Sequence, residues 1–154
     1  ITVLDRPFDG YFMTKTYRMP DNDCGCVEPG TKAEKTVPIS RLRVRSFITS
    51  VMDGAALKAG RQELAGFAFD GGSGIRRVLV STDGGKGWTD ARLGPDGGRY
   101  AFRGWSLPVE LGAGAHVLMA RAETLAGEVQ PMVASWNPHG YARNVVEQVK
   151  VRAT

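Results

Sequence analysis

Short apolar runs separated by glycine, proline and aspartate dominate the chain from Arg41 onward. Within these runs hydrophobic and polar residues tend to alternate, and residues two apart point to the same side of a β-strand. The pattern therefore predicts strands with one covered face, and no long amphipathic helix. The seven predicted strands are Arg41–Val51, Gln62–Phe69, Ile75–Thr82, Trp88–Leu93, Arg99–Val109, His116–Thr124 and Asn144–Val151.

Turn-forming sequences lie between these runs. The triplet Asp-Gly-Gly occurs three times at equal intervals, beginning at Asp70, Asp83 and Asp96, and each copy falls between two predicted strands. Asp-Gly supplies the positive backbone angles that tight hairpin turns require. A calcium loop would need its oxygen ligands to converge on one point, whereas these carboxylates are a strand apart. We expect an all-β fold, an immunoglobulin-like β-sandwich of about seven strands, with an extended N-terminal segment.

The first forty residues differ in texture from the rest. Residues 1–20 mix aromatic and charged side chains, whereas residues 21–40 are polar, contain glycine and proline, and show no periodicity. We interpret residues 21–40 as a linker and residues 41–154 as one domain. A chain of 154 residues has room for one domain of ordinary size.

Composition narrows the possible partners. The net charge of +4 is carried mostly by arginines, which suit planar recognition of oxyanions. These arginines are scattered and form no aromatic-plus-basic motif, so we expect no nucleic-acid partner. No apolar run approaches the roughly 18–20 residues that span a bilayer, so we expect no membrane partner.

Few residues offer catalytic chemistry. The chain has no nucleophile elbow and no phosphate-cradling loop, and its two histidines exclude a three-histidine metal site. We therefore predict no catalytic, cofactor-binding or metal-ligating residue. Cys24 and Cys26 are separated by one glycine, too close for an ordinary structural disulfide that closes a long loop. We interpret them as loop thiols, with a redox or adventitious metal role as the alternative.

Two groups of side chains are candidates for binding. Arg41, Arg43 and Arg45 alternate with apolar residues, which predicts three guanidinium groups on one face of the first strand. This ridge would contact a subunit or an anion, or it would be a solvated face that blocks edge-to-edge pairing of sheets. His139 lies among turn formers and aromatics in the segment from Trp136 to Tyr141, and such loops often display binding groups.

Several motifs in order resemble one known family. They are RSFITS from Arg45, LAGFAFDG from Leu64, STDGGKGW from Ser81, YAFRGW from Tyr100 and WNPHGY from Trp136. Over about residues 41–152 they resemble the C-terminal dimerisation domain of molybdopterin oxidoreductases of the sulfite-oxidase type, in particular the bacterial sulfite dehydrogenases. Residues 1–20 look like the end of the molybdopterin-binding domain that precedes it in that family.

The resemblance implies a parent enzyme with a molybdenum–molybdopterin cofactor. In that family the cofactor domain supplies the cysteine that ligates molybdenum, so we expect this chain to be a fragment that lacks the molybdenum site and is not catalytic by itself. The implied partners are a second copy of the chain, the molybdopterin domain of the same polypeptide and a cytochrome c as electron acceptor. The bacterial relatives imply a periplasmic location.

The resemblance also selects individual residues. Animal and plant members carry an arginine in the Trp-Asn-x-x-Gly turn that reaches the anionic substrate pocket, and His139 stands at that position here. His139 and Arg143 are thus the substrate-pocket candidates, with packing of a surface loop as the alternative. Arg41, Arg43, Arg45 and Trp105 are the candidates for the dimer interface, whereas Trp88 is expected in the core.

Two alternative functions remain open at this point. The first is a free-standing immunoglobulin-like module for adhesion or ligand binding, for which the fold alone is sufficient. The second is an enzyme of the same family that acts on another sulfur substrate. Histidine is neutral over much of the physiological pH range, whereas arginine is permanently charged and bidentate, so His139 keeps this second alternative open.

Overall fold

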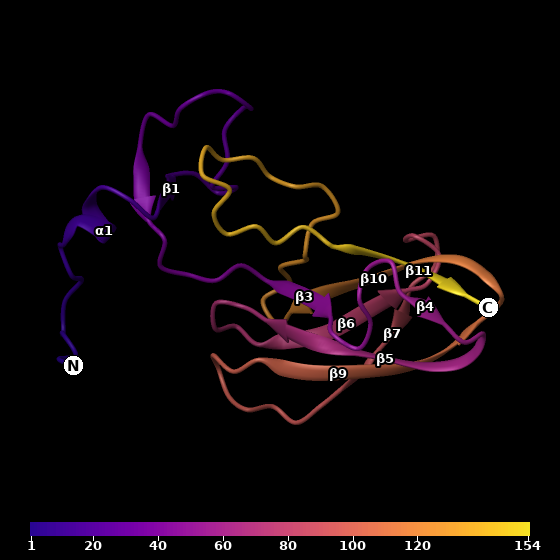
Figure 1. Ribbon diagram of the computed structural model, residues 1–154. Coiled ribbons are helices and arrows are strands. Elements are labelled where there is room, and N and C mark those ends of the chain that lie inside the picture. Colours follow the sequence, from indigo (N-terminus) through magenta and orange to yellow (C-terminus); the bar gives the residue numbers. More distant parts are fainter. The chain divides into compact units, whose positions relative to one another are not determined.

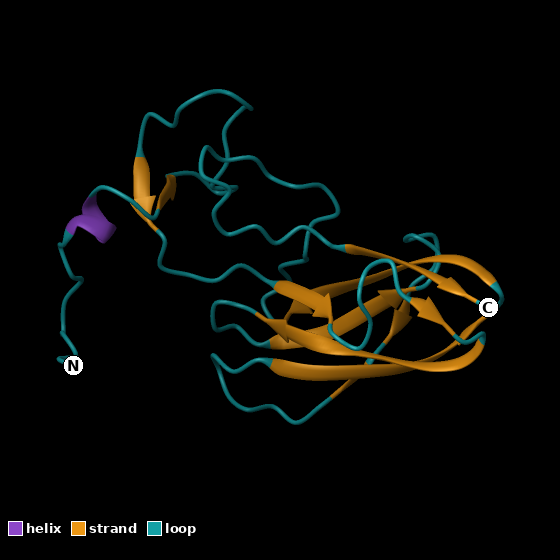
Figure 2. Ribbon diagram, viewed as in Figure 1, coloured by secondary structure: helices purple, strands orange, loops and turns teal.

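The computed structural model describes all residues, 1–154, and the chain folds into two compact units (Figure 1). One unit combines Ile1–Arg41 with Ala134–Arg143, and the other combines Leu42–Val133 with Asn144–Thr154. Strands make up nearly all of the regular structure (Figure 2). No helix is long and apolar enough to cross a membrane.

The larger unit is built from two sheets. One has the strand order β4-β11-β10-β6-β7 and the other has the order β3-β5-β9-β8. All neighbouring strands are antiparallel except β4 and β11, which are parallel. The strands of the first sheet are β4 (Ala56–Leu57), β6 (Ile75–Ser81), β7 (Thr89–Asp90), β10 (Gly114–Thr124) and β11 (Gln148–Ala153). Those of the second are β3 (Arg45–Ile48), β5 (Gly60–Phe69), β8 (Arg92–Leu93) and β9 (Arg103–Leu111).

The hydrophobic core lies between these two sheets. Leu64 of β5, Val78 of β6 and Leu118 of β10 belong to one cluster and are at most 2% exposed. Burying each such side chain stabilises the fold by about 1.5–3 kcal/mol. Because alternate residues of both sheets meet in this layer, the arrangement confirms the predicted all-β sandwich.

Four predicted strands differ by several residues from those observed, and one of them, Arg99–Val109, begins only at Arg103 of β9. The first predicted strand is confined to β3, and the last begins at Gln148, after a segment in which Asn144 donates to the carbonyl of Val44. The run Trp88–Leu93 was predicted as one strand, but it divides at Ala91 into β7 and β8, which join different sheets. The N–H of Ala91 donates to the carbonyl of Val78 where the chain crosses over. Trp88 precedes β7, half-buried, and its ring lies 4.7 Å from the guanidinium carbon of Arg121.

Two of the three Asp-Gly-Gly turns are hairpins, as predicted. Asp83 lies between β6 and β7, and Asp96 lies between β8 and β9, which are hydrogen-bonded pairs. At Asp83 the N–H of Gly87, the Ser81 hydroxyl and the N–H of Lys86 donate to the carboxylate and lower its pKa. The prediction is wrong for Asp70, because β5 and β6 lie in different sheets and this turn carries the chain from one layer to the other.

The Asp70 turn makes stability depend on pH. Burial alone would raise the pKa of Asp70, but its carboxylate accepts hydrogen bonds from the Ser73 hydroxyl and from the N–H groups of Ser73 and Gly74, and the net effect lowers the pKa. A carboxyl group whose pKa is lowered by folding stabilises the fold at pH values above the ordinary pKa of aspartate. This contribution is lost as the pH falls through the pKa that Asp70 has in the folded protein.

We therefore expect Asp70→Asn to lower the free energy of unfolding at pH 7 by about 1–3 kcal/mol, since the hydrogen bonds to a charged acceptor are lost. The difference from the unchanged protein should shrink as the pH falls below about 4. Urea denaturation at a series of pH values measures this difference. Ser73→Ala should reproduce part of the effect, and a gap independent of pH would contradict the assignment.

The smaller unit contains a short helix and a two-stranded sheet. The helix is α1 (Tyr11–Thr14), and β1 (Arg18–Pro20) pairs antiparallel with β2 (Thr36–Pro38). Residues 21–40, predicted to be a linker, thus supply one strand of this unit. Arg18 fixes the pair, because its guanidinium donates to the hydroxyl and the carbonyl of Thr36 and to the carbonyl of Met13.

The prediction of two loop thiols is wrong, since Cys24 and Cys26 form a disulfide. Gly25 between them adopts a left-handed conformation, with φ +53°. This turn brings the two Cα atoms to 5.1 Å, within the range that a disulfide requires. The spacing of the two cysteines excludes a disulfide that closes a long loop, but this disulfide closes a turn with a single residue between the cysteines.

Candidate functional site

The outer face of the β3-β5-β9-β8 sheet is the first candidate site. In β5, Leu64 and Ala68 point into the core, so Phe67 and Phe69 point outward. The register places Phe47 of β3 opposite Phe67 and Gly104 of β9 on its other side, on the same outer face. This face therefore carries large aromatic rings beside residues with small side chains.

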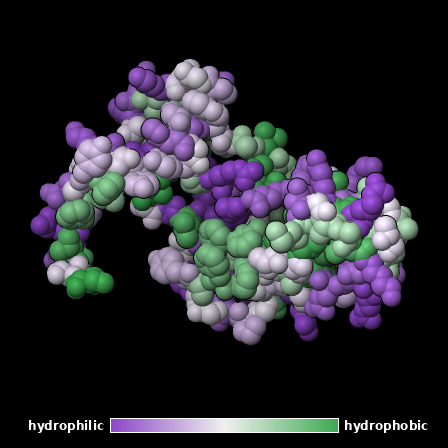
Figure 3. All heavy atoms as spheres, in the orientation of Figure 1, coloured by the Kyte–Doolittle hydropathy of each residue, from purple (hydrophilic) through white to green (hydrophobic).

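The aromatic rings contact one another and remain accessible. Phe69 stacks on Phe102, with ring centroids 4.5 Å apart, and meets Phe47 edge-on at 6.5 Å. Phe67 is 43% exposed and Phe102 is 53% exposed. Hydrophobic side chains gather over this sheet in Figure 3. We call Phe47, Phe67, Phe69 and Phe102 the aromatic face.

Arg45 lies at the border of the aromatic face. Its guanidinium forms an ion pair with Glu147 at 2.5 Å and lies 5.7 Å from the centre of the Phe47 ring. Of the three arginines predicted to form a ridge, Arg45 alone is in a strand; Arg43 is half-buried just before β3. Arg41 is exposed and belongs to the other unit. The ridge on one strand is therefore not formed as predicted.

Trp105 lies in the core, not on the surface. Its side chain is 3% exposed and belongs to the hydrophobic cluster between the sheets. The register places it opposite Gly66, whose missing side chain makes room for the indole. Trp105 therefore presents no side-chain surface to a partner, and it acts on the outer face only by supporting β5 and β9.

A hollow lies next to the aromatic face. It has a volume of about 490 Å³ and is lined by residues of β8, β9 and the turn that joins them, among them Arg92, Pro95, Gly104 and Ser106. Arg92 and Ser106 are paired in the register and share the outer side of the sheet. The face thus combines protruding rings with a recess, as a self-complementary surface requires.

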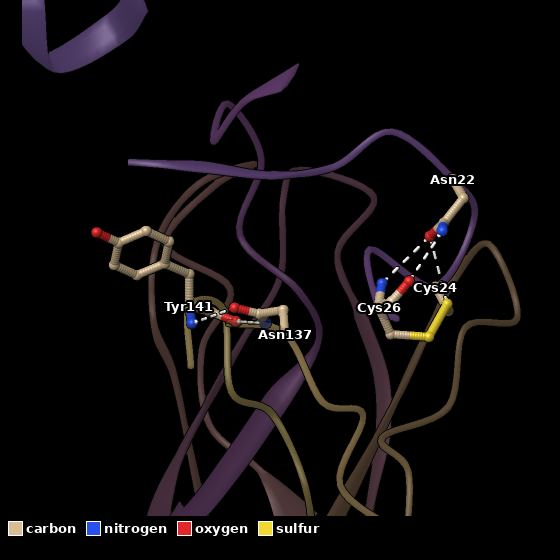
Figure 4. Close-up of a disulfide and its surroundings, with 5 residues drawn as sticks. All are labelled: Asn22, Cys24, Cys26, Asn137 and Tyr141. Atoms are coloured by element: carbon tan, nitrogen blue, oxygen red, sulfur yellow. Dashed lines mark hydrogen bonds between the residues drawn. A yellow bond between two sulfur atoms is a disulfide. The ribbon is translucent and has the colours of Figure 1, made fainter. Parts of the chain in front are cut away.

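The second candidate site is the turn from Trp136 to Tyr141, in the smaller unit. Asn137, which is 7% exposed, organises it: its side-chain oxygen accepts from the N–H groups of His139 and Tyr141, and its amide donates to the carbonyl of Tyr141. Figure 4 shows the hydrogen bonds between Asn137 and Tyr141. The three hydrogen bonds all come from one side chain, so Asn137 fixes the shape of the turn.

His139 is exposed on this turn and stacks on Tyr141, with ring centroids 5.3 Å apart. It lines a pocket of about 270 Å³ together with three basic residues of the same unit, Lys15, Arg18 and Lys32. No carboxylate lines this pocket. The charges therefore favour an anion. Arg143 is also exposed, but it does not line this pocket.

The residues present do not fit a molybdenum centre. The only cysteine sulfurs belong to Cys24 and Cys26, which are bonded to each other, so neither offers a thiolate to a metal. No group of three or more histidine, cysteine, aspartate and glutamate side chains is positioned to hold a metal ion. The structure therefore assigns no cofactor ligand to this chain.

A contiguous patch of accessible aromatic side chains is typical of a surface that contacts another protein. The family description "Mo-co oxidoreductase dimerisation domain" matches residues 36–154, which include β2 and the whole larger unit. The chain belongs to this family.

Curated relatives are sulfite oxidases. The enzyme of Gallus gallus is 36% identical over 124 residues, covering 75% of this chain and 27% of that protein. The enzyme of Arabidopsis thaliana is 28% identical over 166 residues, covering 99% of this chain and 42% of that protein. The mitochondrial enzyme of Homo sapiens is 34% identical, covering 73% and 22%. The chain thus spans less than half of the length of each.

A solved structure shares the fold. The sulfane dehydrogenase SoxCD from Paracoccus pantotrophus matches with a TM-score of 0.71 and 24% identity, over 96% of this chain and 38% of that chain. At this level of identity, the likeness concerns the fold.

Reasoning from the sequence missed the aromatic face and the basic pocket. The run Leu-Ala-Gly-Phe-Ala-Phe from Leu64 is apolar at every position, which is typical of a strand covered on both sides, and this signal marks the face. Lys15 and Arg18 lie close together in the sequence, whereas Lys32 lies in the segment 21–40, which has no periodicity. Only the pairing of β1 with β2 brings them together, so spacing in the sequence gave no signal for the pocket.

Proposed function

We propose that this chain is the subunit-contacting part of a molybdenum-dependent sulfite oxidoreductase, and that two copies meet through the aromatic face. The observation that carries the proposal is the cluster of accessible phenylalanines on the outer side of one sheet, in a chain that belongs to a family of dimerisation domains. Catalysis would belong to the molybdopterin domain, and the chain would contribute assembly and the His139 turn.

The residue types on the aromatic face are those expected at the centre of a subunit interface. Aromatic side chains are enriched in the buried centres of interfaces, and small neighbours such as Gly104 and Ala65 allow a partner backbone to approach. In a two-fold contact the same patch lies on both subunits, so rings of one copy would enter the hollow beside Arg92 of the other. Arg45, held by Glu147, would lie at the rim.

Sedimentation equilibrium tests the proposal. We expect the chain to form dimers, and Phe67→Asp to raise the dimer dissociation constant at least about 100-fold, because a carboxylate would be buried among the aromatic rings of the interface. Val133→Asp changes an exposed apolar residue outside the face and is the matched control. The proposal fails if the unchanged chain is monomeric at high concentration, or if both variants dissociate equally.

The basic pocket favours an anionic substrate in the parent enzyme. We propose that His139 and the pocket beside it contribute to binding sulfite or another sulfur-containing anion, with Arg143 as a further cation on the same segment. The neutral form of His139 offers one donor, so an enzyme acting on a less charged sulfur substrate is the second candidate. We propose a cytochrome c as electron acceptor. The disulfide favours an oxidising compartment such as the periplasm.

Kinetics of the whole enzyme with His139→Arg separate the two candidates. If sulfite is the substrate, the added permanent charge should increase kcat/KM for sulfite by about 10-fold, through a charge-assisted hydrogen bond. If a less charged substrate is used, the same change should lower kcat/KM for it. Lys150→Arg introduces the same guanidinium at an exposed position of β11 that does not line the pocket, and it is the control. An unchanged kcat/KM for both substrates would show that His139 does not contribute to substrate binding.

A further inference from the structure

The Cys24–Cys26 disulfide is not explained by the assembly role of the chain. A disulfide stabilises a fold mainly by restricting the unfolded chain, and this effect grows with the length of the loop that it closes. Here the two cysteines are separated by a single residue, so the cross-link restricts almost nothing. Stability therefore does not explain this disulfide, and its chemical reactivity is the remaining property to consider.

The disulfide is accessible to a thiol. Cys24 is exposed, whereas Cys26 is half-buried. Thiol–disulfide exchange begins with the attack of a thiolate on a disulfide sulfur, and access to that sulfur decides whether it occurs. Exposed disulfides tend to be the labile, regulatory or catalytic ones. Because Cys24 is the more exposed residue of the two, we expect an incoming thiolate to attack its sulfur.

Asn22 holds the two cysteines together without using the bond between them. Its amide donates to the carbonyl of Cys26 at 2.9 Å, and its oxygen accepts from the N–H of Cys26 at 3.2 Å (Figure 4). The N–H of Gly25 donates to the carbonyl of Asn22 at 3.0 Å. The same Asn22 oxygen lies 3.3 Å from the sulfur of Cys24, where a reduced thiol could donate to it. None of these contacts needs the bond between the sulfurs, so after reduction they would keep the two cysteines in one loop, but the Cα–Cα separation of 5.1 Å would no longer be held by the disulfide.

The loop also contacts the turn that carries His139. The N–H of Val27, which follows Cys26, donates to the carbonyl of Trp136 at 3.0 Å. Trp136 begins the turn that Asn137 organises. A change in the backbone at Cys26 would therefore act on a hydrogen bond one residue away.

We propose that Cys24 and Cys26 form a reversible dithiol–disulfide couple that reacts with thiols, and that its reduction weakens the hydrogen bond between Val27 and Trp136. A thiolate attacks the sulfur of Cys24, forms a mixed disulfide and releases Cys26 as a thiolate. A second thiol then displaces Cys24. In sum, the protein disulfide and two thiols give the protein dithiol and one small-molecule disulfide, a two-electron exchange. This proposal is based only on the contacts of this loop and does not depend on the proposed dimer.

Glutathione redox buffers test the couple in the full chain. After equilibration, free thiols are trapped with maleimide and counted by mass spectrometry, while circular dichroism follows the fold. We expect the trapped fraction to change from below about 10% to above about 90% over a series of glutathione ratios or, for a more reducing couple, dithiothreitol ratios, with the sandwich folded throughout. A disulfide that is reduced only when the chain unfolds would overturn the proposal.

Hydrogen exchange tests the link to the turn. Reduction should speed exchange of the Val27 amide at least about 5-fold and leave the core amide of Leu118 unchanged. The double variant Cys24→Ser with Cys26→Ser should exchange like the reduced chain in any buffer. Equal exchange at Val27 in both redox states would disprove the link.

The role of Asn22 has a separate readout. Asn22→Ala should slow re-formation of the disulfide after the reductant is removed by about 10-fold, because the thiols are no longer held together. Asp23→Ala, a change at the next exposed residue, is the matched control and should re-form the bond at the original rate. Equal rates for the two variants would show that Asn22 does not preorganise the couple.

Discussion

Replacing Gln130 with alanine should lower the free energy of unfolding of the sandwich by about 3–5 kcal/mol. Gln130 is 1% exposed, and its side chain connects the two sheets. Its oxygen accepts from the N–H of Ser46 in β3 at 2.8 Å and from the N–H of Ala122 in β10 at 3.2 Å, and its amide donates to the carbonyl of Ser46 at 3.2 Å. Alanine would leave these buried groups without partners and would open a cavity.

Urea denaturation followed by tryptophan fluorescence measures this loss. Gln148→Ala removes the same side chain from an exposed position in β11 and should change the free energy of unfolding by no more than about 0.5 kcal/mol. Gln130→Leu keeps most of the volume but not the hydrogen bonds, so it separates the two contributions. If Gln130→Ala costs less than about 1 kcal/mol, the bridge between the sheets contributes little to stability.

The sandwich could be predicted from the sequence because its signals are local. Alternation along β5, β6 and β10 and the turn chemistry at Asp83 and Asp96 depend only on neighbouring residues. The bridge by Gln130 depends on residues far away in the chain, such as Ser46. In the sequence Gln130 is one polar residue before a proline, and nothing local distinguishes it from a surface glutamine.

The difference between local signals and long-range contacts also explains the predictions that were wrong. The run Trp88–Leu93 reads as one strand by composition, but the sheet that each half joins is decided by long-range pairing, β7 with β6 and β8 with β9. The Arg41–Arg45 ridge assumed a strand longer than β3. Residues 21–40 have no periodicity because a two-stranded sheet and a disulfide, not a hydrophobic core, give them their structure.

The candidate sites could be predicted only in part. The position of His139 in a turn was visible from its neighbours, and the turn is present with Asn137 at its centre. The basic residues around it come from two other segments of the chain, Lys15 and Arg18 from one and Lys32 from the other. Its aromatic side chain makes Trp105 a candidate for the interface, but the space next to Gly66 places it in the core. Which aromatic side chains are accessible depends on the strand register, which the sequence alone does not determine.

Gly66→Ala should lower the free energy of unfolding by about 2–4 kcal/mol, although it adds only one methyl group. A Cβ atom at Gly66 would lie 2.0 Å from the carbonyl oxygen of Phe47 and 2.5 Å from the indole of Trp105. The first contact is with backbone, so β3 would have to move away from β5 at the point where Ile48 pairs with Gly66. Trp105 cannot move aside, because it is packed in the core.

Gly104→Ala is the matched control for this prediction. Gly104 pairs with Phe67 in the adjacent strand β9, and the nearest atom to an added Cβ is a ring carbon of Phe67 at 3.9 Å, an ordinary contact. The free energy of unfolding of Gly104→Ala should therefore change by no more than about 1 kcal/mol. Alanine also reduces the conformational freedom of the unfolded chain, which stabilises the folded protein slightly. Because β3 and β5 carry Phe47 and Phe67, Gly66→Ala should also weaken dimerisation at temperatures where the chain remains folded. Equal stability of the two variants would mean that β3 is not held against β5 by the missing side chain of Gly66.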